Sequence, residues 1–182
     1  MANRAKPIPQ YFRHLHSKPC WQAVAEFGTY LSLYFGAPKV KVLEAKPGAR
    51  SMHNKRRRAF VDGEFLLWVE MADWEYSAQR KSRIRPTSRA RIRQVAVELR
   101  GQVLVHITVK PRLRETTFRF DQGGALRVWP GVDLRDDDVL WHFFLTEQGH
   151  AISFRADGQF EYGPSSRKAS TLVRSTAVVY AV

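Results

Sequence analysis

The feature that most constrains the fold is a two-residue alternation of apolar and polar side chains, which begins after Lys39 and recurs to the C-terminus. Residues 103–109 show it most clearly, because valine or isoleucine occupies every second position. Alternation of this kind is typical of a strand with one buried face. Short turns containing glycine separate the runs, and connections so short join only antiparallel neighbours. The chain is therefore expected to be mainly β.

Nine to eleven strands are expected beyond Lys39. Asp62-Gly63, Gly101, Gly123-Gly124 and Asp157-Gly158 mark the tightest turns, where glycine tolerates a positive φ. The apolar runs between the turns are 58–61, 65–71 (extended by Trp74 and Tyr76), 95–99, 103–109, 116–120, 126–129, 139–146, 151–155, 159–162 and 171–182. The last of these is expected to be a terminal strand that the fold pairs or covers.

One helix is predicted ahead of the strands, over residues 17–36. Ser17 is a typical N-cap residue, and Pro19 falls in the first turn, where its missing N–H costs nothing. Gly36 followed by Pro38 is a helix stop signal. The apolar residues between these signals recur at helical spacing; they are Trp21, Val24, Phe27, Leu31, Tyr34 and Phe35.

These patterns predict an α+β, mainly β fold. One N-terminal amphipathic helix is expected to pack on a curved, largely antiparallel sheet or on a barrel-like two-layer sheet. A chain of 182 residues buries roughly 70% of the surface that its unfolded form exposes, which is enough for one core. The expectation is a single domain over 1–182, divided into an irregular arm at 1–16, the helix at 17–36 and a β-rich body at 39–182.

Positive charge is the main functional signal. The chain has 30 Lys or Arg against 17 Asp or Glu, a formal charge of +13. Two clusters carry most of the excess: Arg50 with 55–58, and a second group made of Arg80, Lys81, Arg83, Arg85, Arg89, Arg91 and Arg93. The last three alternate with other residues, so on a strand they would form a comb on one face. Arginine binds phosphate and carboxylate groups with two parallel hydrogen bonds, so such a comb would hold anions.

The charge pattern predicts a non-catalytic binding module that presents a basic surface to an anionic protein partner. The expected site residues are Arg56, Arg57, Arg58, Arg89, Arg91 and Arg93. One alternative is binding to the backbone of a nucleic acid. Another is an enzyme or small-ligand binder with a pocket inside the sheet.

No cofactor or metal is expected. The six histidines have no metal-ligand spacing, and the acidic run 133–138 lacks the spacing of a calcium loop. His106 and His142 lie on expected strands and are candidate general bases, but no nucleophile motif accompanies them. The lone Cys20, the lack of an apolar N-terminal segment and the lack of an 18-residue apolar run predict a cytoplasmic protein without membrane contact.

About half of the chain, from Trp74 to Pro164, resembles small uncharacterised bacterial β-rich proteins, some of which are similar to immunity proteins associated with secreted toxins. The resemblance is one of pattern, and it involves residues 99–103, 118–121, 126–130, Trp141 and the turn 157–158. It implies a bacterial protein with a β-rich fold. It carries no catalytic or ligand-binding residue.

Overall fold

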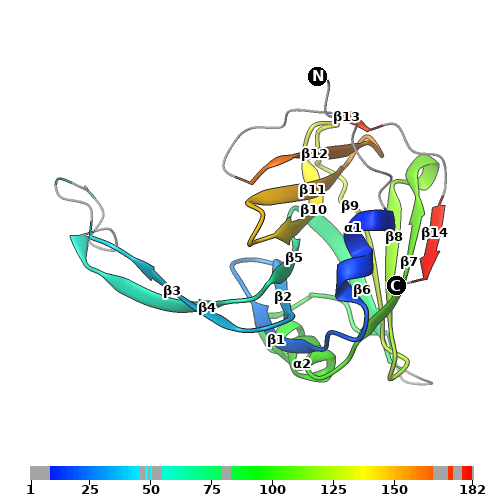
Figure 1. Cartoon of the computed structure of the whole chain (residues 1–182). Helices are drawn as coiled ribbons and strands as arrows, with labels where there is room; N and C mark the ends of the chain where they lie inside the picture. Colours follow the sequence, from blue (N-terminus) through cyan, green and yellow to red (C-terminus); the bar gives the residue numbers. More distant parts are fainter. Residues whose placement is uncertain are drawn as a thin grey trace.

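Antiparallel strands dominate the fold, as predicted. The computed structural model describes residues 9–45, 48, 50, 55–78, 83–165, 172–173 and 178–181. Its strands form three sheets (Figure 1), and every described strand pair is antiparallel. The expected hairpin partners beyond residue 103 are all present. The mainly β, largely antiparallel prediction is confirmed.

Seven strands form the largest sheet. In spatial order they are β1 (Cys20–Ala25), β2 (Leu31–Phe35), β5 (Phe65–Val69), β10 (Val139–Leu145), β11 (His150–Arg155), β12 (Phe160–Pro164) and β13 (Leu172–Val173). The second sheet contains β14 (Val178–Ala181), β7 (Leu104–Lys110), β8 (Glu115–Phe120), β9 (Ala125–Pro130) and β6 (Ala72–Ser77). A separate ribbon pairs β3 (Lys39–Leu43) with β4 (Arg58–Asp62). The helical segments are α1 (Pro9–Phe12), η1 (Arg13–Leu15), α2 (Arg89–Leu99) and η3 (Pro111–Leu113).

The two larger sheets pack face to face around one cluster of buried apolar residues. Trp141 of β10 is fully buried, and its ring meets the edge of Phe118 of β8 with 5.5 Å between centroids. Its indole N–H donates to Thr116 Oγ1 at 3.0 Å, so a hydrogen bond also crosses the layers. The larger sheet ends at β1 and β13, and the smaller at β14 and β6. The described strands form two open layers, and no barrel closes.

The prediction of an N-terminal helix over 17–36 is wrong, because these residues form the β1–β2 hairpin. The structure buries Leu31, Leu33 and Phe35, so the buried apolar positions repeat every two residues. Phe27 falls in the hairpin loop, where 87% of its surface is exposed. Gly28 next to it has a φ of +62°, a conformation that reverses the chain at little cost for glycine.

The longest helix in the described part of the chain is α2, which includes residues 95–99 that were predicted to be a strand. The predicted terminal strand over 171–182 is also corrected. Its described residues form two short strands, β13 in the larger sheet and β14 in the smaller one. The remaining residues of that range lie outside the described part of the chain.

Residues 9–15 form α1 and η1 in place of the expected irregular arm, whose residues 1–8 lie outside the described part. Both segments lie between the strands of the two larger sheets (Figure 1). Tyr11, Phe12 and Leu15 are buried there. The Phe12 ring lies 4.7 Å from Phe143 and 6.2 Å from Trp141, measured between centroids. The N-terminal helical turns therefore complete the core.

We expect Phe12→Ala to lower the free energy of unfolding by about 3–5 kcal/mol, because it empties a fully enclosed aromatic site. Denaturant unfolding measures this change. Arg13→Ala, at an exposed neighbouring position, is the control and should change stability by less than about 0.5 kcal/mol. Equal stability of the two variants would mean that this segment does not belong to the core.

Candidate functional site

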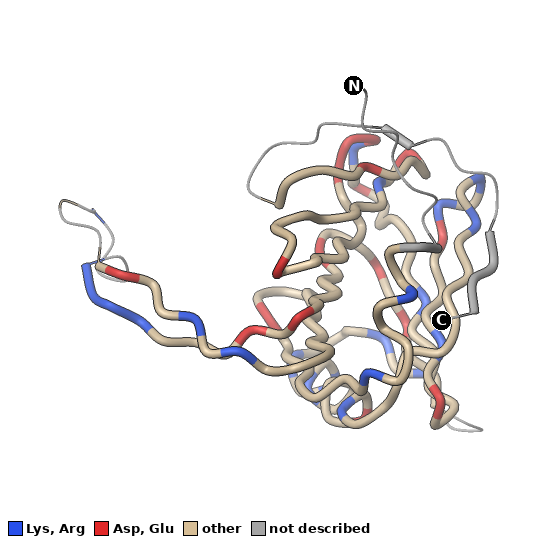
Figure 2. Tube along the Cα trace, in the orientation of Figure 1, with Lys and Arg blue, Asp and Glu red and all other residues tan. Residues whose placement is uncertain are grey.

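The six arginines expected to form the site lie on two separate parts of the molecule (Figure 2). Arg56 and Arg57 precede β4 and Arg58 begins it, at the far end of the ribbon that projects from the larger sheet (Figure 1). Arg89, Arg91 and Arg93 lie on α2, which packs on the edge strand β1. The structure therefore divides the basic residues between two surfaces.

The predicted comb of three arginines on a strand is wrong, because these residues form the first turns of α2. Ser88 caps the helix by accepting a hydrogen bond from the backbone N–H of Arg91 at 3.4 Å. The helix buries one stripe at helical spacing, made of Ile92, Val95, Ala96 and Leu99. Successive helix positions turn by about 100°. Arg89 and Arg93 therefore lie one turn apart on the same side, and Arg91 points elsewhere.

Arg89 and Arg93 line a groove of about 390 Å³ between α2 and β1. Arg100 lies at the other end of the groove and donates from Nη2 to the carbonyl oxygen of Ala23 at 2.9 Å. The ion pairs between described residues involve none of these three guanidinium groups. The floor contains small apolar side chains of β1. The groove thus presents unneutralised positive charge beside apolar surface.

The β3–β4 ribbon projects from the body (Figure 1), and the segment 39–62 that contains it is called the arm. It carries eight basic and two acidic residues, a formal charge of +6 out of the total of +13. Ion pairs occupy Lys39, Lys41 and Arg57. Among the described residues, no acidic side chain pairs with Arg56 or Arg58.

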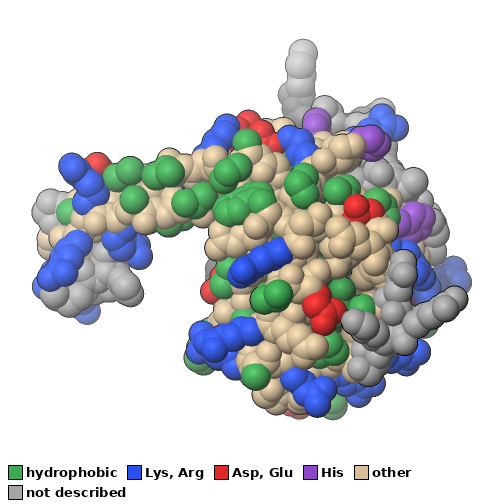
Figure 3. Space-filling model, turned by 90° about the horizontal axis from the view of Figure 1, so that it is seen from below, with side chains coloured by type: hydrophobic (Ala, Val, Ile, Leu, Met, Phe, Trp, Pro, Cys, Tyr) green, Lys and Arg blue, Asp and Glu red, His purple; other side chains and the backbone are tan. Residues whose placement is uncertain are grey.

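The arm also exposes a series of large apolar side chains. Five of the eleven exposed large apolar residues in the described chain belong to it: Val40 (70% exposed), Val42 (51%), Leu43 (46%), Phe60 (42%) and Val61 (44%). Val40 lies opposite Val61, and Val42 lies opposite Ala59, so these four share one face of the ribbon. Figure 3 shows apolar side chains along the arm, with Lys and Arg near its end. Two-stranded ribbons are marginally stable in water, and in the described part of the chain this one leaves an apolar face exposed.

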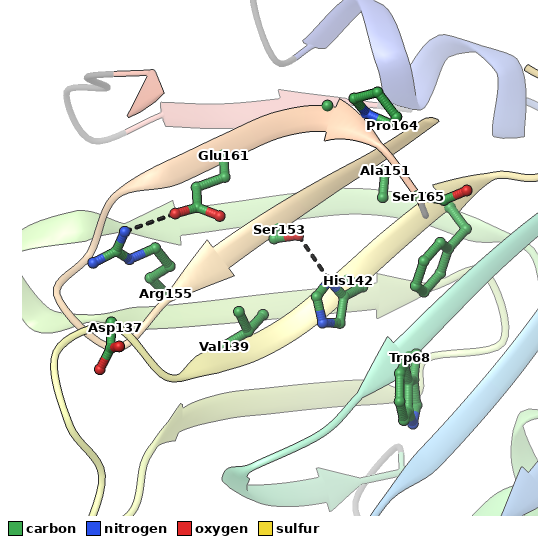
Figure 4. Close-up of a pocket in the computed structure, with 12 residues that line it drawn as sticks. Trp68, Asp137, Val139, His142, Ala151, Ser153, Arg155, Glu161, Pro164 and Ser165 are labelled. Atoms are coloured by element: carbon green, nitrogen blue, oxygen red, sulfur yellow. Dashed lines mark hydrogen bonds and ion pairs between the residues drawn. The ribbon is translucent and has the colours of Figure 1, made fainter. Parts of the chain in front are cut away.

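A second cavity, of about 550 Å³, lies on the outer face of the larger sheet (Figure 4). The pairing register of the strands brings its lining residues together. One row of directly opposite residues crosses four strands, from Trp68 on β5 through His142 and Ser153 to Glu161 on β12. Phe144 lies beside Trp68, with 6.3 Å between ring centroids. Aromatic side chains therefore border one end of the cavity, and charged side chains border the other.

His142 connects two polar partners in this row. Its Nε2 lies 3.1 Å from Glu70 Oε2, and its Nδ1 lies 2.7 Å from Ser153 Oγ. An ionised carboxylate only accepts hydrogen bonds, so Nε2 of His142 carries a proton and donates it to Glu70. Ser153 Oγ is the hydrogen-bond partner on the other side of the ring.

The charged end of the cavity contains Arg155, whose terminal nitrogens are already occupied. Nη1 donates to Glu161 Oε1 at 2.6 Å, and Nη2 donates to Asp157 Oδ2 at 3.0 Å. The hydrogen bond to Glu161, with the charge of Asp157 nearby, raises the pKa of Arg155 above its ordinary value. Two carboxylates thus share one guanidinium group, which leaves local negative charge in a basic protein.

The sequence identifies His142 as a candidate general base, but it indicates neither the hydrogen-bond partners of His142 nor the cavity. Residues 139–146 and 151–155 were expected to be adjacent strands. Pairing of these strands in a hairpin is the one sequence feature that could have indicated the His142–Ser153 contact. Glu70 lies 72 positions before His142, and only the tertiary fold brings it there. The other candidate base, His106, lies on β7 opposite Arg119 and lines neither cavity.

Comparisons found no protein family, curated protein or solved structure that matches the chain. Within the described residues, no group of three or more His, Cys, Asp or Glu side chains is placed to hold a metal ion. No helix in the same part of the chain is long and apolar enough to cross a membrane.

The helical placement of the arginines makes a prediction that the strand comb does not. Arg93→Glu should weaken the binding of a fluorescent octaglutamate peptide about fivefold at low salt, because it reverses a charge inside the groove. Arg91→Glu makes the same charge change outside the groove and should weaken binding less than about twofold. Fluorescence anisotropy measures both affinities. Equal losses of peptide affinity in the two variants would show that binding depends only on the net charge of the protein and not on the groove.

Proposed function

We propose that the protein is a non-catalytic binding module that docks on an acidic protein partner through the arm. The observation that carries this proposal is the arm itself, which exposes five large apolar side chains and whose Arg58, without an ion pair among the described residues, lies directly opposite Leu43. The α2 groove, with Arg89, Arg93 and Arg100, provides a second basic surface for the same class of partner.

The mixture of apolar and cationic side chains favours a protein over a nucleic acid. Protein interfaces bury an apolar centre inside a polar rim and are enriched in arginine. Interfaces with nucleic acid are more polar, because most of their contacts go to phosphate and sugar. A phosphate backbone would leave the face of Val40, Val42 and Val61 without an apolar surface to cover it. An acidic protein would satisfy both the apolar face and the charge.

Little of the arm contributes to the core, which supports a role in binding. All described residues of β3 and β4 are exposed except Lys41 and Asp62, which are half-buried. Binding to a partner would account for these exposed residues, since packing of the core does not. Positive charge near the end of the arm would steer an acidic partner toward it.

A photocrosslinking experiment tests the proposal. A photoreactive phenylalanine analogue is placed at Val42 on the arm or, as a control, at Val132, which is 98% exposed on the body. In a lysate of the cells that produce the protein, the Val42 probe should give a discrete adduct with an acidic protein. The Val132 probe should not give this adduct. Arg56→Glu combined with Arg58→Glu should reduce its yield about tenfold, because it reverses two positive charges near the end of the arm that would steer an acidic partner.

Other outcomes contradict the proposal. A nuclease-sensitive adduct would favour the nucleic-acid alternative, and an adduct between two copies of this chain would make the arm a self-association element. The same adduct from both positions, or no adduct from either, would mean that the arm is not a docking surface.

A further inference from the structure

We infer that the cavity on the outer face of the larger sheet binds an organic cation, a primary ammonium group carried on an apolar body. This inference is independent of the proposed docking function, because it concerns the opposite charge and different strands. It rests on the acceptor oxygens at the cavity, on its aromatic end and on its charge.

The polar groups at the centre of the cavity are acceptors. Nε2 of His142 donates to Glu70, and Ser153 Oγ lies 2.7 Å from Nδ1, where its hydroxyl oxygen keeps lone pairs that can accept from a ligand. Glu161 lies directly opposite Ser153 and is only 15% exposed. One of its oxygens, Oε1, accepts from Arg155. No hydrogen bond or ion pair between described residues involves its other oxygen, Oε2, so this row offers acceptors to a ligand that donates hydrogen bonds.

The donors of Arg155, the arginine that lines the cavity, are occupied or enclosed. The terminal nitrogens of Arg155 are taken by Asp157 and Glu161. Its Nε is enclosed and has no partner among the described residues. An ammonium group supplies three donors and a positive charge, and both match two carboxylates that share a single arginine.

The other end of the cavity suits the body of such a ligand. Trp68 and Phe144 border it, with Val139, Ala151 and Pro164 also in the lining. Indole and phenyl rings attract organic cations and cover apolar carbon. A carboxylic acid or phosphate would meet lone pairs and carboxylates at the same place, so an anionic ligand is disfavoured.

Titration of the full-length protein with 2-phenylethylamine and its neutral isostere 2-phenylethanol tests the inference. The indole N–H signals in nuclear magnetic resonance spectra report binding, and Trp68→Phe assigns the signal of Trp68. The amine should bind about tenfold more tightly than the alcohol, because only the amine makes charge-assisted hydrogen bonds. A capped Ala-Lys-Ala peptide distinguishes a free amine from a lysine side chain as the natural source.

Two variants locate the ammonium group. Glu161→Gln should weaken amine binding about tenfold and leave alcohol binding unchanged, because it removes charge but little volume. Ser153→Ala should weaken amine binding severalfold, which keeps the test valid if Glu161→Gln fails to fold. Glu44→Gln removes the same charge on the arm and is the control.

Equal affinity for amine and alcohol would overturn the inference, because the cavity would then be only an apolar surface. Binding of neither the amine nor the lysine peptide to the folded protein would also overturn it. Arm variants that abolish partner docking should leave amine binding intact, so the failure of one proposal is distinguishable from the failure of the other.

Discussion

The register of β5 between β2 and β10 determines which side chains enter the core and which line the outer cavity. It directs Leu67 and Val69 into the core and places Trp68 on the outer face, opposite His142. The chain continues from β2 into β3 and from β4 into β5, so the arm extends this same strand pair. A slip by one residue would exchange the faces of β5 and remove both the core contact and the cavity. One pairing register therefore builds the body, the cavity and the base of the arm.

Much of the β-structure could be predicted, because glycine turns separate runs with one clearly apolar face. Prediction failed where two periods fit the same residues. Val95, Val97 and Leu99 alternate as in a strand, but Ile92, Val95 and Leu99 also fit a helix, and Ser88 caps it. In β1 and β2 the outer face is itself aromatic, with Trp21 and Tyr34 5.8 Å apart. Because apolar residues lie on both faces of these strands, the two-residue alternation is not apparent in the sequence, and the apolar positions also fit the spacing of a helix.

The candidate sites were harder to foresee than the fold, because each depends on residues far apart in the chain. The basic clusters were visible as composition, but their separation onto the arm and α2 follows from topology. The chain's charge is divided in a way that composition does not reveal. The arm holds nearly half of the net positive charge, whereas carboxylates outnumber the guanidinium group at the cavity. This division is consistent with two ligands of opposite charge on one scaffold.

Whether the arm is a docking element added to a self-sufficient body is tested by replacing residues 38–62 with an Asn-Gly turn. This turn joins β2 to β5 as a tight hairpin. We expect the shortened protein to fold cooperatively with a Tm within a few degrees of the full chain, since β3 and β4 bury almost nothing. We also expect that it no longer captures the acidic partner. A shortened protein that fails to fold, or that folds and still captures the partner, would contradict the assignment of the arm as a docking element added to a self-sufficient body.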